Sequence, residues 1–530
     1  MKEIILKKNE MRWLFGGIGF HDSEATMLGI MSDDFKNQRV LKTFREISPT
    51  YSRVFTGYAD WTKEAMDEFA DFYDLTFRKA NTTLYLVPGR LPYRTSDFDM
   101  DEYAEKVATN LDYLIKVRKC AKIRHYCLTN ELACGNGRPL VYYLDEFKAM
   151  QEALYRAFRR HGLKIGLLSM DSAGMGDPWH YHDWALENMD EITECYCHHF
   201  YPSNYEPGTS RLYNDLYWRL DLLVQRSLAK EKRFVLGEFG IKKTVPSKAM
   251  RSDCASYVDF PDLEPTAAIQ LAEIAVCAIN TGCFSAACWT LFDYPDPFIA
   301  EDGDTEEEKK RFNVANYSGH GISTRYNKNG MVRWSDEEGD YRAYASLYTM
   351  GYMAKLFRKG SRVLSPEFDD DMLRMAAVTN PDGTCSVVMI NWRDTPETVM
   401  LKSEHKSDKP FRKYEYCADN PPYNDFNDLQ DFVGLVSEEN GSYVVELPAC
   451  SVVFLTTDYQ ERIPSEIKNL KVEDGCLMWD ACPDEEHCYY RIYQNGKQIA
   501  STVAEYLAVS NIEGGYEVYS VDKYGNCARR

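Results

Sequence analysis

Between residue 13 and about residue 358, short apolar runs alternate with longer stretches whose apolar residues recur every three or four positions. The short runs have the length of strands, and the longer stretches have the period of amphipathic helices. Such an alternation is typical of a parallel α/β domain. The pattern predicts strands at Trp13–Phe20, Tyr51–Gly57, Thr83–Pro88, His125–Asn130, Ile165–Met170, Glu194–Tyr201, Phe234–Phe239 and Phe284–Phe292.

Helices are predicted between these strands. The clearest are Trp61–Ala80, Met100–Lys119, Leu144–His161 and Pro265–Thr281, and a last helix at Tyr341–Phe357 would complete the domain. Eight strand–helix units in about 350 residues fit a TIM (β/α)8 barrel. The rival fold, a doubly wound open sheet, would place a GxGxxG turn after the first strand. The glycines of Gly16–Gly19 lie within that strand instead, which favours the barrel.

The pattern changes after Lys359. Runs with the alternation of strands, such as Met372–Thr379, Cys385–Trp392 and Tyr443–Leu455, follow one another with turn residues between them. The sequence Asn-Pro-Asp-Gly at 380–383 is a strong hairpin signal. Residues 360–458 are therefore predicted to form a β-sandwich, after a barrel that spans residues 1–359.

Residues 459–530 form a third predicted unit. This tail resembles a fibronectin type III domain over about seventy residues. The resemblance rests on Trp479 in an early strand, on Tyr489–Tyr493 followed by the turn Asn495-Gly496, and on Gly515–Tyr519 near the end. It implies a small all-β domain.

Composition narrows the class of protein. The chain has 530 residues, of which 44% are hydrophobic and 27% charged, as expected for a soluble globular protein with more than one domain. Its formal net charge of −20 disfavours nucleic acid and anionic membranes as partners and is compatible with a neutral sugar. Lys7 and Lys8 interrupt the apolar run at the N-terminus, so no export signal is expected. With sixteen cysteines mostly inside apolar runs, the predicted location is the cytoplasm.

Two carboxylates follow predicted strands directly. Glu131 comes after the fourth apolar run, and Glu238 ends the seventh. Because the active site of a TIM barrel lies at the C-terminal ends of its strands, both should meet at the barrel mouth. A pair of carboxylates is what glycosidic bond cleavage requires. Apolar neighbours would raise the pKa of the acid, Glu131, and Arg and Tyr donors would keep the nucleophile, Glu238, ionised.

The motifs Asn130-Glu131 and Gly237-Glu238-Phe239-Gly240 resemble those of clan A glycoside hydrolases. The second motif is most similar to that of family 5, the cellulase-like family. The resemblance implies that Glu131 is the acid/base and Glu238 the nucleophile, and that Asn130 binds the substrate 2-hydroxyl.

Four more positions match the clan pattern. Arg53 resembles the arginine that holds the nucleophile ionised. His199 and Tyr201 resemble its His-x-Tyr motif, in which the tyrosine contacts the nucleophile and the histidine lines the sugar site. Trp289 resembles the aromatic floor beneath the sugar. Leu132 departs from family 5, where proline is common, and a following β-sandwich is more similar to families 30, 39 and 51.

These residues predict a retaining glycosidase that cleaves β-glycosidic bonds of an oligo- or polysaccharide, with carboxyl groups about 5–5.5 Å apart and no cofactor. Two alternatives stay open. An inverting enzyme would show a separation of about 6.5–9.5 Å, and a non-catalytic carbohydrate-binding protein could keep the same barrel.

Other residues give weaker signals. Cys195, Cys197, His198 and His199 suggest a metal, but side chains alternate along a strand, so the four should not converge and no metal site is expected. Asp171 and His21 follow strands and could line the sugar pocket. Five aromatic residues in loops or helices could form outer subsites: Tyr58, Trp61, Trp179, Trp184 and Tyr205.

Overall fold

The structure is a computed structural model of the whole chain. It describes residues 2–8, 11, 13–22, 33, 36–88, 98–132, 144–173, 179–202, 210–241, 264–295, 326–327, 330–333, 342–404, 408–510 and 514–528.

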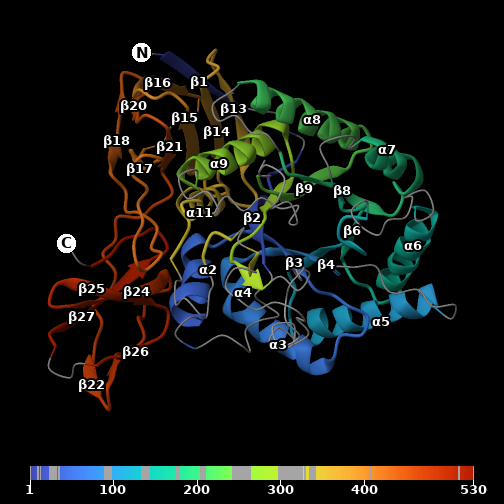
Figure 1. Cartoon of the computed structure of the whole chain (residues 1–530), viewed down its shortest axis with the longest axis horizontal. Coiled ribbons are helices and arrows are strands. Elements are labelled where there is room, and N and C mark those ends of the chain that lie inside the picture. Colours follow the sequence, from blue (N-terminus) through green and yellow to red (C-terminus); the bar gives the residue numbers. More distant parts are fainter. Residues whose placement is uncertain are drawn as a thin grey trace, which may run out of the picture.

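A closed barrel of eight parallel strands forms the first part of the chain (Figure 1). Its strands are β2 (Gly17–His21), β3 (Tyr51–Phe55), β4 (Thr83–Val87), β5 (Ile123–Tyr126), β6 (Gly166–Leu168), β8 (Thr193–Phe200), β9 (Arg233–Phe239) and β10 (Ser285–Cys288). Neighbours pair in chain order, and β10 pairs with β2. β6 pairs directly with the first part of β8, and the short β7 (Ser172–Ala173) pairs with its last part. The predicted barrel and its eight strands are confirmed.

Helices surround the barrel, and they form where the apolar residues of the sequence recur every three or four positions. They are η3 (Lys36–Val40), α2 (Leu41–Ile47), α3 (Lys63–Leu75), α4 (Phe77–Ala80), α5 (Met100–Asp112), η4 (Tyr113–Val117), α6 (Leu144–Arg160), α7 (Trp179–Asn188), α8 (Ser210–Ala229), α9 (Glu264–Thr281) and α11 (Leu347–Leu356). Side-chain caps start two of them: Thr62 accepts from the Ala65 N–H before α3, and Asp99 accepts from two N–H groups of α5. The predicted helix Trp61–Ala80 is divided at Thr76, which has non-helical backbone angles.

The second sheet has ten strands and is antiparallel except at one pairing. They are β1 (Lys2–Lys8), β13 (Arg362–Glu367), β14 (Leu373–Thr379), β15 (Cys385–Asn391), β16 (Glu397–Ser403), β17 (Phe411–Cys417), β18 (Gly434–Val436), β19 (Glu438–Glu439), β20 (Ser442–Leu447) and β21 (Ser451–Thr456). Side chains from several strands of this sheet form a hydrophobic core of their own, which includes Ile4, Val387, Leu401 and Val445.

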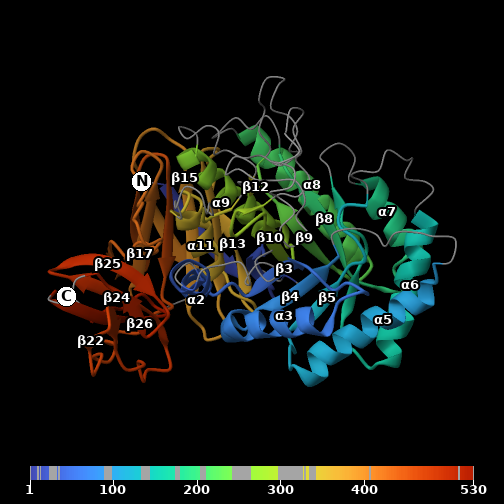
Figure 2. The same ribbon diagram turned by 60° about the horizontal axis from the view of Figure 1, so that its bottom comes forward.

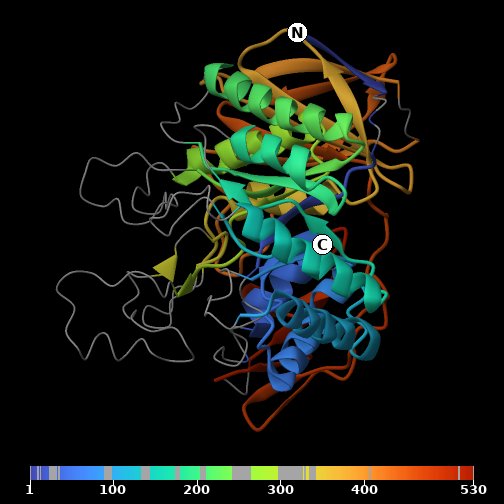
Figure 3. The same cartoon turned by 90° about the vertical axis from the view of Figure 1, so that its right-hand side faces the viewer.

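The N-terminal strand belongs to this second sheet. β1 pairs in parallel with β16 and antiparallel with β13, so residues 2–8 lie outside the barrel although the sequence analysis assigned residues 1–359 to it. Figure 3 shows this dark-blue strand beside the orange strands. The strand has no helix after it, and nothing local in the sequence identifies partners more than 350 positions away.

The last part of the chain forms two three-stranded sheets. They consist of β22 (Lys471–Glu473), β23 (Cys476–Met478) and β26 (Tyr506–Ala508), and of β24 (His487–Gln494), β25 (Lys497–Thr502) and β27 (Tyr516–Asp522). Trp479 and Tyr490 pack between them with ring centroids 5.3 Å apart. Figure 2 shows this red module against α2 and the orange sheet. Leu41 of α2 is buried against its residues Tyr489 and Val521.

Within the part of the chain that the structure describes, no helix is both long enough and apolar enough to cross a bilayer.

Candidate active site

Arg53 is the centre of the candidate site at the barrel mouth. It lies on β3, is fully buried, and contacts four side chains. Its Nη1 lies 2.5 Å from Glu238 Oε1 and 3.0 Å from His21 Nδ1, and its Nη2 lies 2.6 Å from both Asp171 Oδ2 and Asn130 Oδ1. Burial would lower the pKa of Arg53, but the Glu238 and Asp171 carboxylates raise it well above its usual value. A permanent cation therefore sits between two carboxylates.

Glu238 is directed into the site by a local irregularity of β9. The register between β8 and β9 shifts at Gly237, which turns the next side chain inward. A Cβ at position 237 would lie 2.5 Å from Cys197 Sγ and 3.0 Å from His199 Nε2, so only glycine fits. The Glu238 side chain is 4% exposed, and its Oε2 accepts a hydrogen bond of 2.6 Å from the Tyr201 hydroxyl.

Glu131 lies nearer to solvent. It follows β5 in an irregular segment and has a φ of +42°, a conformation that is uncommon for a residue with a side chain. The next residue, Leu132, donates its N–H to the Asp171 carbonyl at 3.2 Å. The Glu131 side chain is 22% exposed, and its Oε1 lies 3.0 Å from His199 Nδ1.

The two glutamates face each other across this site. One oxygen of Glu131, one of Glu238 and a ring nitrogen of His199 all lie within 4.8 Å of one another. An approach of two carboxylate oxygens to within 4.8 Å is compatible with the carboxyl separation of about 5–5.5 Å in retaining glycosidases, and it favours that arrangement over the separation of about 6.5–9.5 Å in inverting ones.

His199 connects three carboxylates. Its Nδ1 lies 3.0 Å from Glu131 and 3.5 Å from Glu238, and its Nε2 lies 3.3 Å from Asp171. Burial would lower the pKa of His199, but Glu238 and Asp171 raise it to about 10, so the ring is an imidazolium at neutral pH. The neighbouring ring of His21 is neutral, because burial and Arg53 lower its pKa well below the usual value. His21 Nδ1 therefore accepts from Arg53.

The pKa directions of the two glutamates differ from the expectation. Burial raises the pKa of Glu238, against the opposing effects of His199, Arg53 and Tyr201. Burial also acts to raise that of Glu131, but the contact with His199 lowers it overall. The sequence places Arg53 and Tyr201 near Glu238 but does not reveal that Glu131 shares the His199 cation and that Glu238 lies deeper.

An aromatic wall borders the site. Trp289, which follows β10, has its ring 4.2 Å from that of His21 and 5.5 Å from that of Phe55. The structure thus brings the seven candidates for catalysis and sugar binding into one contiguous group, which consists of Arg53, Asn130, Glu131, His199, Tyr201, Glu238 and Trp289.

The aromatic residues considered for outer subsites do not all face the site. Trp61 packs against Phe69 of α3, and Trp184 packs on the barrel core, so helix packing accounts for both. Tyr58 is 36% exposed. Tyr205 lies outside the described residues, and so does the side-chain environment of Trp179.

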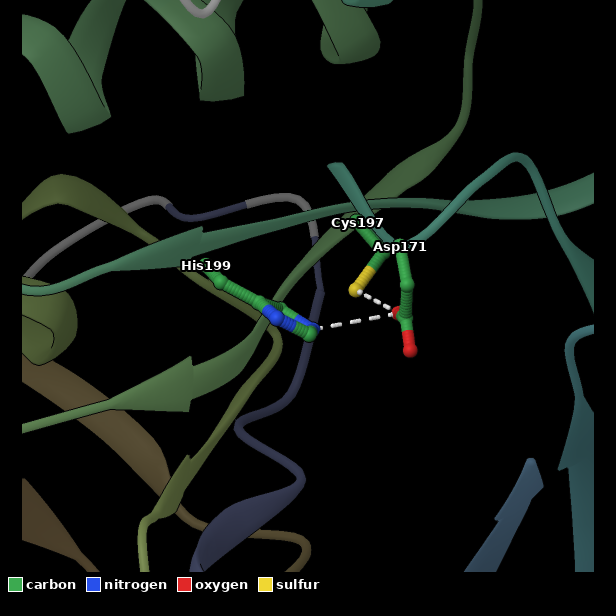
Figure 4. Close-up of side chains that lie close together, drawn as sticks. All are labelled: Asp171, Cys197 and His199. Atoms are coloured by element: carbon green, nitrogen blue, oxygen red, sulfur yellow. Dashed lines mark hydrogen bonds and ion pairs between the residues drawn. The ribbon is translucent and has the colours of Figure 1, made fainter. Parts of the chain in front are cut away.

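Asp171, Cys197 and His199 form a cluster below the glutamates (Figure 4). Cys197 and His199 are two positions apart on β8 and therefore share a face, so these two converge although the four-residue motif as a whole does not. Burial raises the pKa of the Cys197 thiol well above its usual value, and the thiol donates to Asp171 Oδ1 at 3.0 Å. The contacts within the cluster are thus a hydrogen bond from the thiol and an ion pair from the imidazole, both to the Asp171 carboxylate.

No protein-family model and no curated protein matches the chain. Solved structures do match it. The catalytic domain of a glycoside hydrolase family 30 xylanase C from Talaromyces cellulolyticus has a TM-score of 0.58 at 13% identity and covers 86% of this chain and 99% of that chain. A family 30 endoxylanase from Clostridium papyrosolvens C71 has a TM-score of 0.56 at 12% identity, with the same coverage.

A family 51 arabinofuranosidase from Xanthomonas axonopodis pv. citri is also similar, with a TM-score of 0.55 at 14% identity over 86% of this chain and 100% of that chain. At such identities the likeness shows the fold. The chain shares with these structures a (β/α)8 barrel followed by a β domain.

Proposed function

We propose that this protein is a retaining glycoside hydrolase that cleaves β-glycosidic bonds of an oligo- or polysaccharide. The observation that carries the proposal is the pair Glu131 and Glu238 at the barrel mouth, with oxygens within 4.8 Å of each other and unequal surroundings. Glu238 is buried and held by Arg53 and Tyr201, whereas Glu131 is partly exposed. This asymmetry suits one fixed nucleophile and one group that exchanges protons with water.

In the first step, Glu238 attacks the anomeric carbon while Glu131 donates a proton to the leaving oxygen. The carbon–oxygen bond breaks, the leaving group departs as an alcohol, and a glycosyl ester of Glu238 remains. In the second step Glu131, now a carboxylate, removes a proton from water, and the oxygen of that water replaces Glu238. Both carboxyl groups return to their starting states.

Charge neutrality explains how the site holds the required proton. Glu131, Asp171 and Glu238 face the two cations Arg53 and His199, so one added proton makes the group neutral. The two glutamates share this proton, and the pKa values of the pair belong to both residues. Because burial favours the proton on Glu238, the reactive form with Glu131 protonated is the minor one in the free protein.

The nature of the substrate is the less specific part of the proposal. The β-linkage is supported by similar structures described as xylanases and as an endo-β1,6-glucanase, while another is described as an α-L-arabinofuranosidase. Further proposals from the sequence are a cellulase-like specificity, a fibronectin type III-like tail and a cytoplasmic location. The free cysteines of the described chain support that location, and the facing sheets around Trp479 support the tail.

A substrate screen with product analysis tests the proposal. Aryl β-xylosides and β-glucosides, with an aryl α-L-arabinofuranoside as the comparison, are incubated with the full chain, and proton NMR records the first-formed anomer. We expect turnover with retention. The opposite anomer would identify an inverting enzyme, and binding of oligosaccharides without any turnover would favour a carbohydrate-binding protein.

Chemical rescue separates the two roles. Replacing Glu131 by Ala should lower turnover by about 10²–10⁴-fold. Azide should restore it and yield a glycosyl azide of retained configuration, because azide then reacts with the ester of Glu238. The matched variant Glu238→Ala should instead give an azide of inverted configuration. If Glu131→Ala gave the inverted azide and Glu238→Ala the retained azide, Glu131 would be the nucleophile and Glu238 the acid/base.

A further inference from the structure

We propose that Asp171 is a positioning residue, whose buried carboxylate holds Arg53 and His199 from below so that both direct N–H groups at the catalytic carboxylates. This inference rests on the proposed function, because it takes Glu131 and Glu238 as the catalytic carboxylates. The contacts of Asp171 themselves do not depend on any substrate. Asp171 lies three residues after β6 and is 0% exposed. A sugar that enters the barrel mouth therefore does not reach it.

Both oxygens of Asp171 are fully engaged. Oδ2 accepts from Arg53 Nη2 at 2.6 Å. Oδ1 accepts from the Tyr85 hydroxyl at 2.5 Å and from Cys197 Sγ at 3.0 Å, and His199 Nε2 lies 3.3 Å away. Figure 4 shows the thiol and the imidazole directed at the same carboxylate. These donors come from three different strands, β3, β4 and β8, so Asp171 fixes their relative positions.

Each of the two cations bridges Asp171 to a glutamate. Arg53 uses Nη2 for Asp171 and Nη1 for Glu238, at 2.6 and 2.5 Å. His199 uses Nε2 for Asp171 and Nδ1 for Glu131 and Glu238, at 3.3, 3.0 and 3.5 Å. An imidazole has an N–H on both nitrogens only when it is protonated. Because the Asp171 carboxylate lies next to Nε2, it favours the imidazolium form of His199, in which Nδ1 also carries an N–H and donates to the glutamates.

The charges around the pair support this interpretation. Burial would raise the pKa of Asp171, but Arg53 and His199 lower it, so the carboxylate is ionised at neutral pH. The titratable groups that face Asp171 and His199 come from β2, β3, β4, the segment after β5, β8 and β9. They include His21, Tyr51, Arg53, Tyr85, Cys127, Glu131, Cys197 and Glu238. Among these described groups Arg53 is the cation at neutral pH, and Asp171 is the carboxylate in contact with Nε2.

The same three side chains could in principle bind a metal ion. One contact favours hydrogen bonds instead. The Arg53 guanidinium lies 2.6 Å from Asp171 Oδ2, where it would repel a cation. The test below distinguishes the two cases.

The experiment follows the imidazole of His199 directly, in full-length protein with ¹⁵N-labelled histidine. Loss of a signal in His199→Gln assigns the resonance among the ten histidines. In the unchanged protein we expect both ring nitrogens to be protonated from pH 6 to pH 9. In Asp171→Asn, which keeps the shape and removes the charge, we expect the ring to lose a proton at least one pH unit lower. We also expect kcat/KM on an aryl glycoside to fall at least tenfold.

Tyr85→Phe is the matched control. It removes one hydrogen bond to the same carboxylate but leaves the charge, so His199 should stay doubly protonated across that pH range. A merely structural role of Asp171 would make the two variants similar in their His199 titration.

Three results would overturn the inference. They are a His199 that is neutral at pH 7 in the unchanged protein, an unaltered titration in Asp171→Asn, and stoichiometric metal in the purified protein. The protonation state of His199 in the unchanged protein tests the inference even if Asp171→Asn does not fold. Because the titration needs no turnover, a protein inactive on every glycoside but with the expected His199 shift would refute the proposed function alone.

Discussion

Two clusters of buried charge lie on opposite sides of the barrel wall. The site cluster consists of Arg53, Glu131, Asp171, His199 and Glu238. The junction cluster consists of Lys42 and Glu46 on α2, Asp428 in the segment after β17, and Arg491 on β24. The first cluster faces the barrel mouth, and the second joins the barrel, the second sheet and the terminal module.

The junction cluster is balanced. Lys42 Nζ lies 2.5 Å from Glu46 Oε2 and 2.7 Å from Asp428 Oδ1, and Arg491 Nε lies 3.1 Å from Asp428 Oδ2. Two cations thus face two buried carboxylates, and Arg491 Nη2 also lies 3.4 Å from Oδ1 of the exposed Asp431. Tyr489 and the Leu429 N–H donate further hydrogen bonds to Glu46. Each buried charge of the junction cluster therefore has a partner of opposite charge.

The site cluster is unbalanced. Three carboxylates face two cations, one of which is a histidine, and Glu131 remains partly exposed. Burial of charge therefore does not identify a functional site by itself. An excess of carboxylates over cations, a histidine whose pKa is raised by its neighbours, and access from solvent distinguish the site from the junction.

The largest expected effect is on activity, at the site. In Glu238→Gln, kcat/KM should fall on the order of 10⁴-fold or more, because the attacking carboxylate is gone. The free energy of unfolding should change little, since burial favours the protonated form of Glu238 and the Gln amide is also uncharged and of similar shape. Aryl glycoside turnover and urea denaturation measure the two. A large loss of stability would mean that the site cluster holds the fold together as the junction does.

The largest expected effect on stability is at the junction. In Lys42→Met, the carboxylates of Glu46 and Asp428 lose a buried cation, which should lower the free energy of unfolding by about 3–5 kcal/mol. Lys63→Met is the control, because its ion pair with Asp67 is exposed and should contribute little. Activity of the folded Lys42→Met protein should be close to normal. Reduced kcat with unchanged stability would contradict the separation of the two clusters.

The two regions also differ in how far the sequence predicts them. The site residues follow apolar runs that end at one edge of a parallel barrel, so a local pattern locates Glu131, Glu238 and Arg53. The role of Asp171 was only partly foreseen. It satisfies the same strand-end rule, but its contacts with Arg53 and His199 depend on the packing of three strands.

The junction was not predicted from the sequence at all. Lys42 and Glu46 have the spacing of an ordinary exposed helical pair, and their burial depends on Asp428 and Arg491, which are almost 400 and 450 positions away. The same holds for β1, whose partner strands lie after the barrel. Periodicity reports which face of an element is buried but not what covers it.

A smaller effect is expected from Tyr201→Phe. The hydroxyl donates to Glu238 at 2.6 Å, and a hydrogen bond to a charged group contributes about 1.5–3 kcal/mol, which corresponds to a loss of about 10- to 100-fold in kcat/KM. Because this hydrogen bond lowers the pKa of Glu238, its removal should move the acidic limb of the kcat/KM profile to higher pH. A profile shifted to lower pH would contradict the assignment of that limb to Glu238.

The smallest expected effect is the pH dependence of stability that His199 of the site cluster contributes. The pKa of His199 is about 10 in the folded protein and about 6.5 when unfolded, so its contribution is complete below pH 6.5 and disappears as the pH rises through 10. Between pH 7 and pH 8 the folded state holds up to one more proton, and stability should fall by up to about 1.4 kcal/mol from this group.

Urea denaturation at pH 7 and pH 8 isolates that contribution when the unchanged protein is compared with His199→Gln. The difference between the two proteins should shrink as the pH rises, because only the unchanged protein has the proton to lose. Lys42→Met provides the matched case, since it lowers stability but keeps His199 and should retain the full pH dependence. If Lys42→Met removed the pH dependence and His199→Gln preserved it, the titrating group would lie at the junction, and the contrast between the clusters would be reversed.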